Sequence, residues 1–328
     1  MTKKILVTCV PLVRELLGAP GALRPAIDSM LEDGLEPVCF DLPGNRYSME
    51  QFRERIPGVK AAIIGSEPWG EDKLALAEGV AALCRYGVGY DAVDIDNAKR
   101  RGILVTNTRV EELSRSVGEF ALLLTLSALR RIVPAAAAMR DGKWKTLQGG
   151  QLRNKKIGIV GFGAIGRSYA ECLRGFHPRL LVYDPYLDKA EAERLDAHSV
   201  GMDELLSCSD IVSLSAPNTP ENKHLFNRET FQRMKRGAVF INTARGSMVD
   251  EAALFDALSS GRLGGAGLDV WEAEPTAPDN PLLTLDNVVA CPHMSSDSVE
   301  CAIAMAMCAV RQVKDALAGK RPDFVLNP

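Results

Sequence analysis

The stretch that decides the fold is residues 156–184, KIGIVGFGAIGRSYAECLRGFHPRLLVYD. An apolar run at 157–160 stops at a G-x-G-x-x-G motif made by Gly161, Gly163 and Gly166, and a helical pattern follows. A second apolar run, 180–183, ends on Asp184. This order predicts a strand, a tight turn, a helix and a parallel strand, which is the arrangement typical of a dinucleotide-binding unit.

Each glycine has a distinct physical task in that unit. Gly161 permits the turn, Gly163 lets a pyrophosphate approach the backbone, and Gly166 lets the helix and strand pack closely. Phosphates are expected on the free N–H groups where the helix opens, at Ala164 and Ile165. Three glycines alone also occur in ordinary loops, but the flanking strands favour nucleotide binding.

Asp184 follows Gly166 by 18 residues, where a carboxylate accepts hydrogen bonds from an adenosine ribose. No Lys or Arg follows before Lys189, so a 2′-phosphate would meet a carboxylate without a nearby cation. The sequence therefore predicts NAD rather than NADP.

Composition sets the broad class. A chain of 328 residues is longer than one core usually holds, so two domains are expected, and 46% hydrophobic with 25% charged residues is typical of a soluble globular protein. The net charge of -3 gives no electrostatic reason to expect nucleic acid or a membrane as partner. Eight cysteines without a C-x-x-C pair argue against a metal site and favour reduced thiols in the cytoplasm. The longest apolar segment, 120–129, is too short to span a bilayer, and no signal peptide is evident.

Short apolar runs alternate with helical patterns along the chain, which predicts doubly wound α/β structure with parallel strands. Strands are expected at 5–10, 37–40, 61–64, 81–83, 103–105, 211–214, 238–241, 266–270 and 288–290. Helices are expected at 22–32, 48–55, 72–77, 95–101, 116–129, 228–234, 251–259 and 298–317. The capping pair Ser116 and Glu119 is expected to open the apolar helix at 116–129, which we expect to be buried.

Three chemically competent side chains follow predicted strands. Arg245 stands between Ala244 and Gly246, where a guanidinium can grip a carboxylate or form a structural ion pair. His293 suits proton transfer because the ordinary pKa of histidine is about 6.5. A carboxylate beside it would favour the protonated imidazole, and composition leaves both Glu272 and Glu274 open for that position.

These residues resemble the D-isomer-specific 2-hydroxyacid dehydrogenases along nearly the whole chain. Four blocks carry the resemblance: RYGVGYD at 85–91 with GILVTN at 102–107, the glycine motif with Asp184, NTARG at 242–246, and 267–293 from GLDV through EP to PH. The resemblance implies that Arg245 binds the substrate carboxylate and that Glu274 supports the catalytic His293. It also implies further contacts: Asp269 near the nicotinamide, Thr243, Ala244, Ala216 and Pro217 along the cofactor, and backbone N–H groups at Val88 and Gly89 on the substrate carboxylate.

The same resemblance implies the architecture. A Rossmann NAD domain, residues 105–296, is expected as an insertion in a flavodoxin-like substrate domain, residues 1–104 with 297–328. It further implies a cytoplasmic homodimer that passes hydride between NADH and a 2-oxo acid, with His293 as the proton donor.

The substrate remains open at this stage. Phosphoglycerate dehydrogenases typically carry an Arg-Ser-x-Thr type segment where this chain has GSEPW at 65–69, so a phosphate would face Glu67. Glyoxylate, hydroxypyruvate and bulkier 2-oxo acids all remain candidates, and Trp69 either closes the pocket or packs. Two relatives offer alternatives: an NADH-sensing corepressor-like module, and a formate dehydrogenase, which usually has Gln in place of Glu274.

Overall fold

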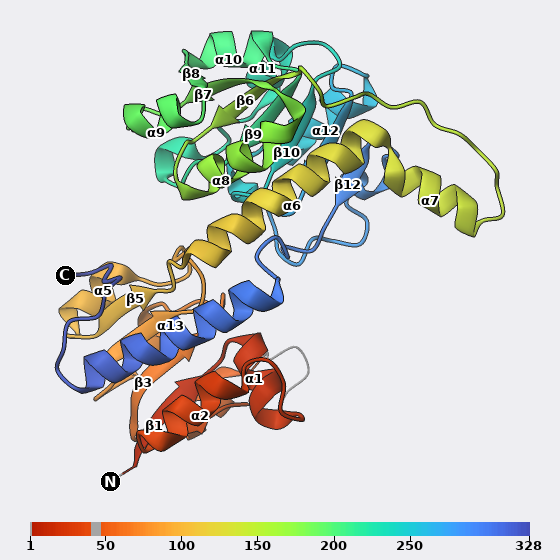
Figure 1. Ribbon diagram of the computed structural model, residues 1–328. Helices are drawn as coiled ribbons and strands as arrows, with labels where there is room; N and C mark the ends of the chain where they lie inside the picture. The colour runs from red at the N-terminus through yellow and green to blue at the C-terminus, as the bar shows by residue number, and fades with distance from the viewer. Residues whose placement is uncertain (1, 41–46) are drawn as a thin grey trace. The chain divides into compact units, whose positions relative to one another are not determined.

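The computed structural model describes residues 2–40 and 47–328 and consists of two compact units (Figure 1). The first unit is Met1–Leu113 with Asp297–Pro328, and the second is Ser114–Ser296. Each is built on one sheet in which the paired strands run parallel. The predicted fold class, two parallel-sheet α/β domains, is confirmed.

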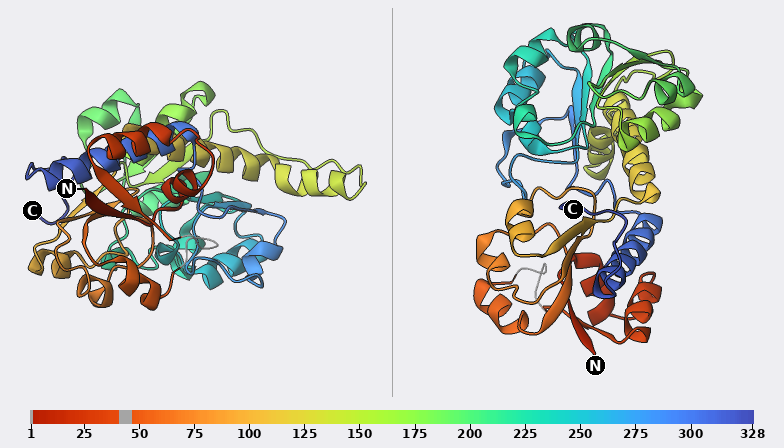
Figure 2. Two further views of the ribbon diagram at one scale, coloured as in Figure 1. Left: turned by 90° about the horizontal axis from the view of Figure 1, so that it is seen from below. Right: turned by 90° about the vertical axis from the view of Figure 1, so that its left-hand side faces the viewer.

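The first unit has the strand order of a flavodoxin-like fold, β2-β1-β3-β4-β5. Its strands are β1 (Lys3–Val7), β2 (Leu35–Val38), β3 (Val59–Ile64), β4 (Ala82–Arg85) and β5 (Leu104–Asn107). One face is covered by α1 (Val10–Leu17), α2 (Arg24–Glu32) and α13 (Val299–Leu317), the red and blue helices in the right panel of Figure 2. The other face packs against α3 (Met49–Arg55), α4 (Glu71–Leu74) and α5 (Ile95–Arg100). Alternate residues of each buried strand therefore enter two different cores.

Several sequence-based boundaries differ from the structure by two or more residues, for example the helix expected at 72–77, which is α4 (Glu71–Leu74), and two of the differences have a clear physical cause. The strand expected at 5–10 stops at Val7, and Val10 begins α1, because Pro11 sits in the first turn where its fixed φ favours a helix start. The helix expected from Ser116 begins at Glu111 and forms α6 (Glu111–Arg130). Glu111 and Glu112 lie in its first turn, where carboxylates stabilise a helix N-terminus.

The C-terminal segment adds to the sheet of the first unit. Leu326 N–H donates to Val105 O at 2.8 Å, and the buried Asn327 side chain accepts from Val105 N–H at 2.7 Å. Asn327 also donates to Ile103 O at 2.8 Å. Hydrogen bonds across more than 200 residues therefore tie the end of the chain to β5.

The second unit has the strand order β12-β11-β10-β9-β6-β7-β8. From β6 the chain adds strands toward one edge of the sheet and from β9 toward the other, so the order of strands reverses between β6 and β9. Its strands are β6 (Lys156–Val160), β7 (Arg179–Tyr183), β8 (Ala197–Ser199), β9 (Ile211–Leu214), β10 (Val239–Asn242), β11 (Gly265–Leu268) and β12 (Val288–Ala290). Counted from β6 this is the order 3-2-1-4-5-6 of a Rossmann sheet with one strand added. Ligands in such sheets bind where the order reverses, outside the carboxyl ends of the strands.

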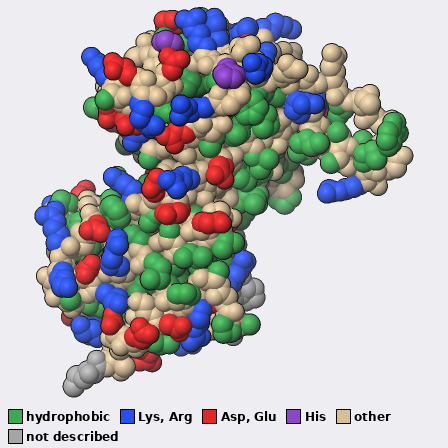
Figure 3. Space-filling model, viewed as in Figure 1, with side chains coloured by type: hydrophobic (Ala, Val, Ile, Leu, Met, Phe, Trp, Pro, Cys, Tyr) green, Lys and Arg blue, Asp and Glu red, His purple; other side chains and the backbone are tan. Residues whose placement is uncertain are grey.

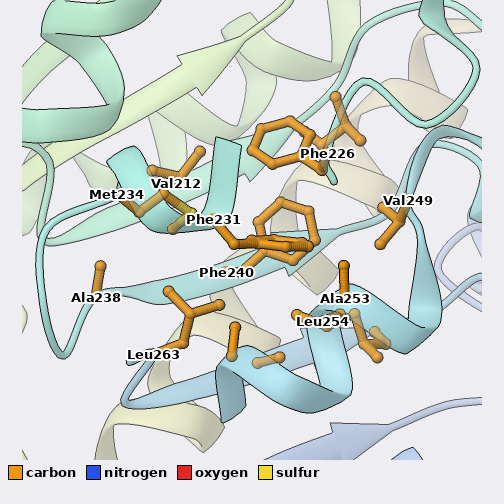
Figure 4. Packing of buried hydrophobic residues seen from close by; sticks show 14 of the residues in the cluster. Val212, Phe226, Phe231, Met234, Ala238, Phe240, Val249, Ala253, Leu254 and Leu263 are labelled. Carbon is orange, nitrogen blue, oxygen red and sulfur yellow. The ribbon is translucent and has the colours of Figure 1, made fainter. Parts of the chain in front are cut away.

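Two cores hold this sheet. α6, α8 (Ala164–Leu173) and α9 (Lys189–Arg194) cover one face. α10 (Met202–Cys208), α11 (Arg228–Arg233) and α12 (Glu251–Ser259) cover the other. In this second core Phe226, Phe231 and Phe240 form a triangle with ring centroids 4.7–5.9 Å apart (Figure 4). Phe240 lies on β10, so this packing fixes the strand that leads to Arg245.

α7 (Ile132–Arg140) differs from every helix above because none of its residues is buried. Ile132, Val133 and Met139 are exposed, and Trp144 beyond it is 87% exposed. In Figures 1 and 2 the helix extends away from the body of its own unit, and Figure 3 shows green apolar side chains gathered there. Within the described ranges no single helix is long and apolar enough to cross a membrane, and the bent pair α6 and α7 meets that criterion only when counted together.

Candidate active site

The glycine motif occupies the point where the strand order of the second unit reverses. Gly161 follows β6 with φ of +90°, and a Cβ atom there would lie 2.5 Å from Ala216 N, just beyond β9. A Cβ at Gly166 would overlap Gly161 O, whereas a Cβ at Gly163 would meet nothing within 4 Å. The motif thus combines a left-handed turn, an open backbone position and a close helix–strand contact.

The amino end of α8 opens toward that free space. Gly163 is the N-cap residue and no described side chain caps the helix, so its first N–H groups are available to a ligand. Gly163 and Ala164 are exposed and Ile165 is half-buried. An uncapped helix start beside an open glycine fits a pyrophosphate.

Asp184 follows β7 and is held by the same loop. Its Oδ2 accepts from Phe162 N–H at 2.8 Å, and its Oδ1 accepts from Tyr186 N–H at 2.8 Å. Among the described residues it forms no ion pair, and the remaining lone pairs of its two oxygens can accept further hydrogen bonds. This arrangement fits ribose hydroxyls and opposes a 2′-phosphate.

Two buried hydroxyls line the same sheet edge. Thr243 Oγ1, after β10, and Ser215 Oγ, after β9, have no hydrogen-bond partner within the described part of the chain. Buried hydroxyls are normally paired, so these two mark places where a bound group can supply the missing partner. Ala216 is half-buried and Pro217 exposed beside Ser215, and Ala244 is nearly buried beside Thr243.

His293 and Glu274 form a pair at the ends of β11 and β12. His293 Nδ1 lies 2.7 Å from Glu274 Oε2, and Glu274 Oε1 accepts from Trp271 N–H at 3.1 Å. Partial burial acts to raise the pKa of Glu274, but the hydrogen bond and charge of His293, the Trp271 N–H and the charge of Arg245 outweigh it and leave the pKa below its usual value. Glu274 is therefore ionised at neutral pH, and the pairing leaves Nε2 of His293 for a reacting group.

Side-chain composition alone left two glutamates open as partners of His293, and the structure pairs His293 with Glu274, the residue that the family resemblance implies. Glu272 Oε1 pairs with His224 Nε2 at 2.6 Å, not with His293. Glu272 is further tied to Glu251, whose Oε1 accepts its N–H at 2.7 Å. His224, which the sequence left without a role, is thus one half of a second, independent pair.

Asp269 organises the backbone around His293. It is fully buried, and its two oxygens accept from Met294 N–H at 2.8 Å and Ser295 N–H at 2.9 Å. His293 N–H donates to Asp269 O at 2.7 Å, and His293 itself has φ of +54°. A non-glycine residue in this region needs support from its surroundings, and Asp269 provides it.

Arg245 follows β10 on a turn held by the strand itself. Asn242 Nδ2 donates to Arg245 O at 3.1 Å, and Asn242 Oδ1 accepts from Ala244 N–H at 3.0 Å. The backbone of Gly246 lies against Trp271 and Glu272, where a Cβ would overlap the Trp271 carbonyl. This contact brings the Arg245 turn against the segment that carries Glu274.

Val88 and Gly89 lie in the first unit, in the loop after β4. Asn107 Nδ2 donates to Val88 O at 2.8 Å, and Thr108 Oγ1 accepts from Gly87 N–H at 2.7 Å. The N–H groups of Val88 and Gly89 donate to no other group in the described ranges. The loop is held from one side while these two donors remain available.

Sequence reasoning did not find Asn242, Trp271 or the packing role of Gly246. The only local signal was a glycine next to the arginine, since the partner of Gly246 is 25 residues away in the sequence. Among residues 2–40 and 47–328, no group of three or more His, Cys, Asp or Glu side chains is placed to hold a metal ion.

The chain is similar to known proteins in sequence. Residues 122–295 match the family model "D-isomer specific 2-hydroxyacid dehydrogenase, NAD binding domain". The chain is 38% identical over 299 residues to a glyoxylate reductase of Korarchaeum cryptofilum, covering 86% of this chain and 90% of that protein. It is 36% identical over 296 residues to a D-3-phosphoglycerate dehydrogenase of Archaeoglobus fulgidus, covering 89% of this chain but only 55% of that longer protein.

Solved structures are similar over the whole chain. A crystal structure of the TT0316 protein of Thermus thermophilus superposes with a TM-score of 0.86 at 34% identity, covering 98% of this chain and 99% of the other. The apo-structure of D-lactate dehydrogenase from Escherichia coli gives a TM-score of 0.86 at 27% identity, covering 99% and 100%.

Proposed function

The chain belongs to the D-isomer specific 2-hydroxyacid dehydrogenase family, and we propose that it interconverts a 2-oxo acid and the corresponding D-2-hydroxy acid with NAD. The observation that carries the proposal is the His293–Glu274 pair, which follows strands of the same sheet as the glycine motif and Arg245. An acid beside the histidine fits a reaction that moves a proton.

The proposed reaction combines hydride transfer with proton transfer at His293. When bound, the nicotinamide supplies or accepts the hydride at the carbonyl carbon. In reduction, protonated His293 gives the proton on Nε2 to the carbonyl oxygen, while Glu274 on Nδ1 stabilises the imidazolium. In oxidation, neutral His293 takes the hydroxyl proton at the same nitrogen.

Arg245 would hold the substrate carboxylate in a charge-assisted hydrogen bond and polarise the adjacent carbonyl. The N–H groups of Val88 and Gly89, in the first unit, would bind the substrate carboxylate, as the family resemblance implies. We therefore propose the first unit as the substrate domain and the second as the cofactor domain. Holding the substrate by its carboxylate makes the transfer effectively unimolecular.

The cofactor preference follows from Asp184. Its carboxylate would accept hydrogen bonds from the ribose, and the same charge would repel a 2′-phosphate. Gly163 and the amino end of α8 would hold the pyrophosphate, with Thr243 and Ser215 as further donors.

We also propose a homodimer in the cytoplasm. The exposed apolar side chains of α7 favour burial against a second copy, because contiguous apolar surface of this kind marks an interaction site. The eight cysteines, all within the described ranges, form no disulfide, which favours a reducing compartment. Light scattering on the purified protein tests the assembly, and a monomer at micromolar concentration would contradict it.

The test of the activity is a panel of 2-oxo acids with NADH and with NADPH, followed by the chirality of the product. We expect NADH-dependent reduction to a D-2-hydroxy acid, and loss of turnover without loss of NADH binding in His293→Ala. Unchanged turnover in that variant would overturn the assignment of His293, and an L-product would overturn the proposed stereochemistry.

A further inference from the structure

Glu67 lies at the carboxyl edge of the sheet in the first unit, on the loop after β3. β3 and β4 are neighbours, with Ile64 opposite Arg85, and Tyr86 N–H donates to Ile64 O at 2.9 Å. The loop that carries Glu67 and the loop that carries Val88 and Gly89 therefore leave adjacent strands at the same edge of the sheet. Neighbouring strands in a sheet lie about 4.8 Å apart.

The carboxylate of Glu67 is held through one oxygen. Oε1 accepts from Thr8 Oγ1, from Trp69 Nε1 at 3.3 Å and from Tyr47 OH at 3.4 Å. Trp69 is fully buried and packs edge-on against Phe52, with ring centroids 5.4 Å apart. The fixed indole explains why Trp69 serves as a donor and packing residue and does not itself close over a ligand.

The second oxygen of Glu67 is different. No described residue donates a hydrogen bond to Oε2, and the side chain is half-buried. In the second unit, the fully buried Asp269, which holds the backbone around His293, uses both carboxylate oxygens within the protein. A carboxylate with a purely structural role would be expected to do the same, because its unused lone pairs lose water on partial burial.

Lys73 is a positive charge that interacts with Glu67 without forming an ion pair with it. It is 8% exposed, and its Nζ donates to Pro68 O at 2.8 Å and to Tyr47 OH at 3.2 Å. The ammonium lies 4.8 Å from the centre of the Tyr47 ring. The described residues contain no ion pair between Lys73 and Glu67, so Lys73 offsets part of the cost of the buried charge while Oε2 remains an acceptor.

We propose that Glu67 determines substrate specificity: Oε2 accepts a hydrogen bond from a donor group on the substrate beyond its 2-oxo carbon. This rests on the proposed function, in which Val88 and Gly89 on the neighbouring loop bind the substrate carboxylate. The preferred substrates are 2-oxo acids with a hydroxyl or a cationic group in that position. A phosphate or a second carboxylate there is disfavoured, because it would meet a negative charge and an acceptor with no donor to offer.

The test compares wild type with Glu67→Gln on five substrates: glyoxylate, pyruvate, hydroxypyruvate, 5-guanidino-2-oxopentanoate and 3-phosphohydroxypyruvate. The Gln carbonyl keeps the three donors on Oε1, so the amide NH2 takes the place of Oε2 and converts an acceptor into a donor. Glu71→Gln is the matched control, since it removes one carboxylate from the same unit at a side chain that is 69% exposed.

We expect wild type to favour hydroxypyruvate over its phosphorylated form by at least about tenfold in kcat/KM. Glu67→Gln should lower kcat/KM for the guanidino acid by about tenfold and raise it for the phosphorylated acid by a similar factor. Glyoxylate, which has no group beyond the carbonyl, should change by less than about threefold, and Glu71→Gln should leave all five unchanged. Whichever of hydroxypyruvate and the guanidino acid has the higher wild-type kcat/KM identifies the kind of donor group that Oε2 prefers.

An equal change on all five substrates would overturn the proposal and assign Glu67 a structural role. If the variant does not fold, the wild-type ratio alone decides: equal use of hydroxypyruvate and its phosphorylated form contradicts the proposal. Failure of wild type to reduce any 2-oxo acid would refute the proposed function itself, and the specificity proposal with it.

Discussion

Replacement of Glu274 by Gln isolates one interaction in the proposed reaction. Glu274 and His293 form a pair at 2.7 Å with 37% and 41% of their side chains exposed. In the same segment, Glu272 forms a similar pair with His224 at 2.6 Å, and 38% and 40% of these two side chains are exposed. Glu272→Gln is therefore a control of the same chemistry, separation and exposure in the same unit.

The magnitude follows from the exposure of the pair. Two unit charges about 4 Å apart interact by about 1 kcal/mol in water and about 4 kcal/mol at an effective dielectric constant of about 20. Exposed pairs are measured at about 0.2–1 kcal/mol. For this pair, which is more than one-third exposed, the upper end of that range, about 1 kcal/mol, corresponds to a shift of just under one pH unit.

The sign follows from the charge of Glu274. Its lowered pKa keeps it ionised through the neutral range, so it stabilises the imidazolium form of the histidine. In reduction the imidazole must be protonated, so kcat/KM for reduction is expected to fall as the pH rises and the imidazole loses its proton. Removal of the negative charge therefore moves the alkaline limb of the kcat/KM profile for reduction to lower pH by about one unit.

The assay is the pH dependence of kcat/KM for reduction with NADH, measured for wild type and both variants. Glu274→Gln should also lose about tenfold at the optimum, since a neutral partner stabilises the imidazolium less. Glu272→Gln should keep the limb in place and kcat/KM within about twofold. An equal displacement in both variants, or none in Glu274→Gln, would refute the assignment of Glu274 as the partner that matters for proton transfer.

Three further predictions concern the second unit. Asp184→Ser should raise the ratio of kcat/KM with NADPH to that with NADH by at least about tenfold, because the repulsion of a 2′-phosphate is removed; an unchanged ratio would show that Asp184 does not read the ribose. Gly246→Ala should lower the free energy of unfolding by about 2–4 kcal/mol in urea titrations, because the new Cβ would overlap the Trp271 carbonyl, whereas Gly175→Ala, with nothing within 4 Å of its Cβ, should change it by less than about 1 kcal/mol. Asp269→Asn should lower turnover strongly and destabilise the protein by about 2–3 kcal/mol, because the two carboxylate oxygens each accept one backbone N–H and an amide NH2 would replace one of these oxygens. Wild-type turnover in this variant would contradict the positioning of His293 by Asp269.

Much of the fold was predictable because its signals are local. The G-x-G-x-x-G motif between two apolar runs predicts strand, turn and helix, and β9, α12 and β12 begin and end at the predicted residues. The helix expected at 48–55 is α3, and its first turn is closed by a capping box of Ser48 and Gln51. Such patterns depend on neighbours within one turn or one strand, so the sequence carries them directly.

Other features depend on contacts that no local pattern encodes. α7 has no buried residue, so it lacks the amphipathic pattern by which buried helices are recognised. The pairing of the C-terminal segment with β5 joins residues more than 200 positions apart.

At the candidate site the sequence determined the chemistry of the side chains: an arginine, a histidine and two glutamates near strand ends. Side-chain composition did not decide which glutamate faces His293; the family resemblance implied Glu274, and the tertiary structure shows the contact, which depends on where the Trp271 N–H and the His224 ring lie in space. The sequence likewise placed Glu67 after a strand, but the hydrogen bonds that occupy one of its oxygens come from Thr8, Tyr47 and Trp69 on separate segments. Residue identity sets what a group can do, and packing between distant segments sets which of its atoms are still available to do it.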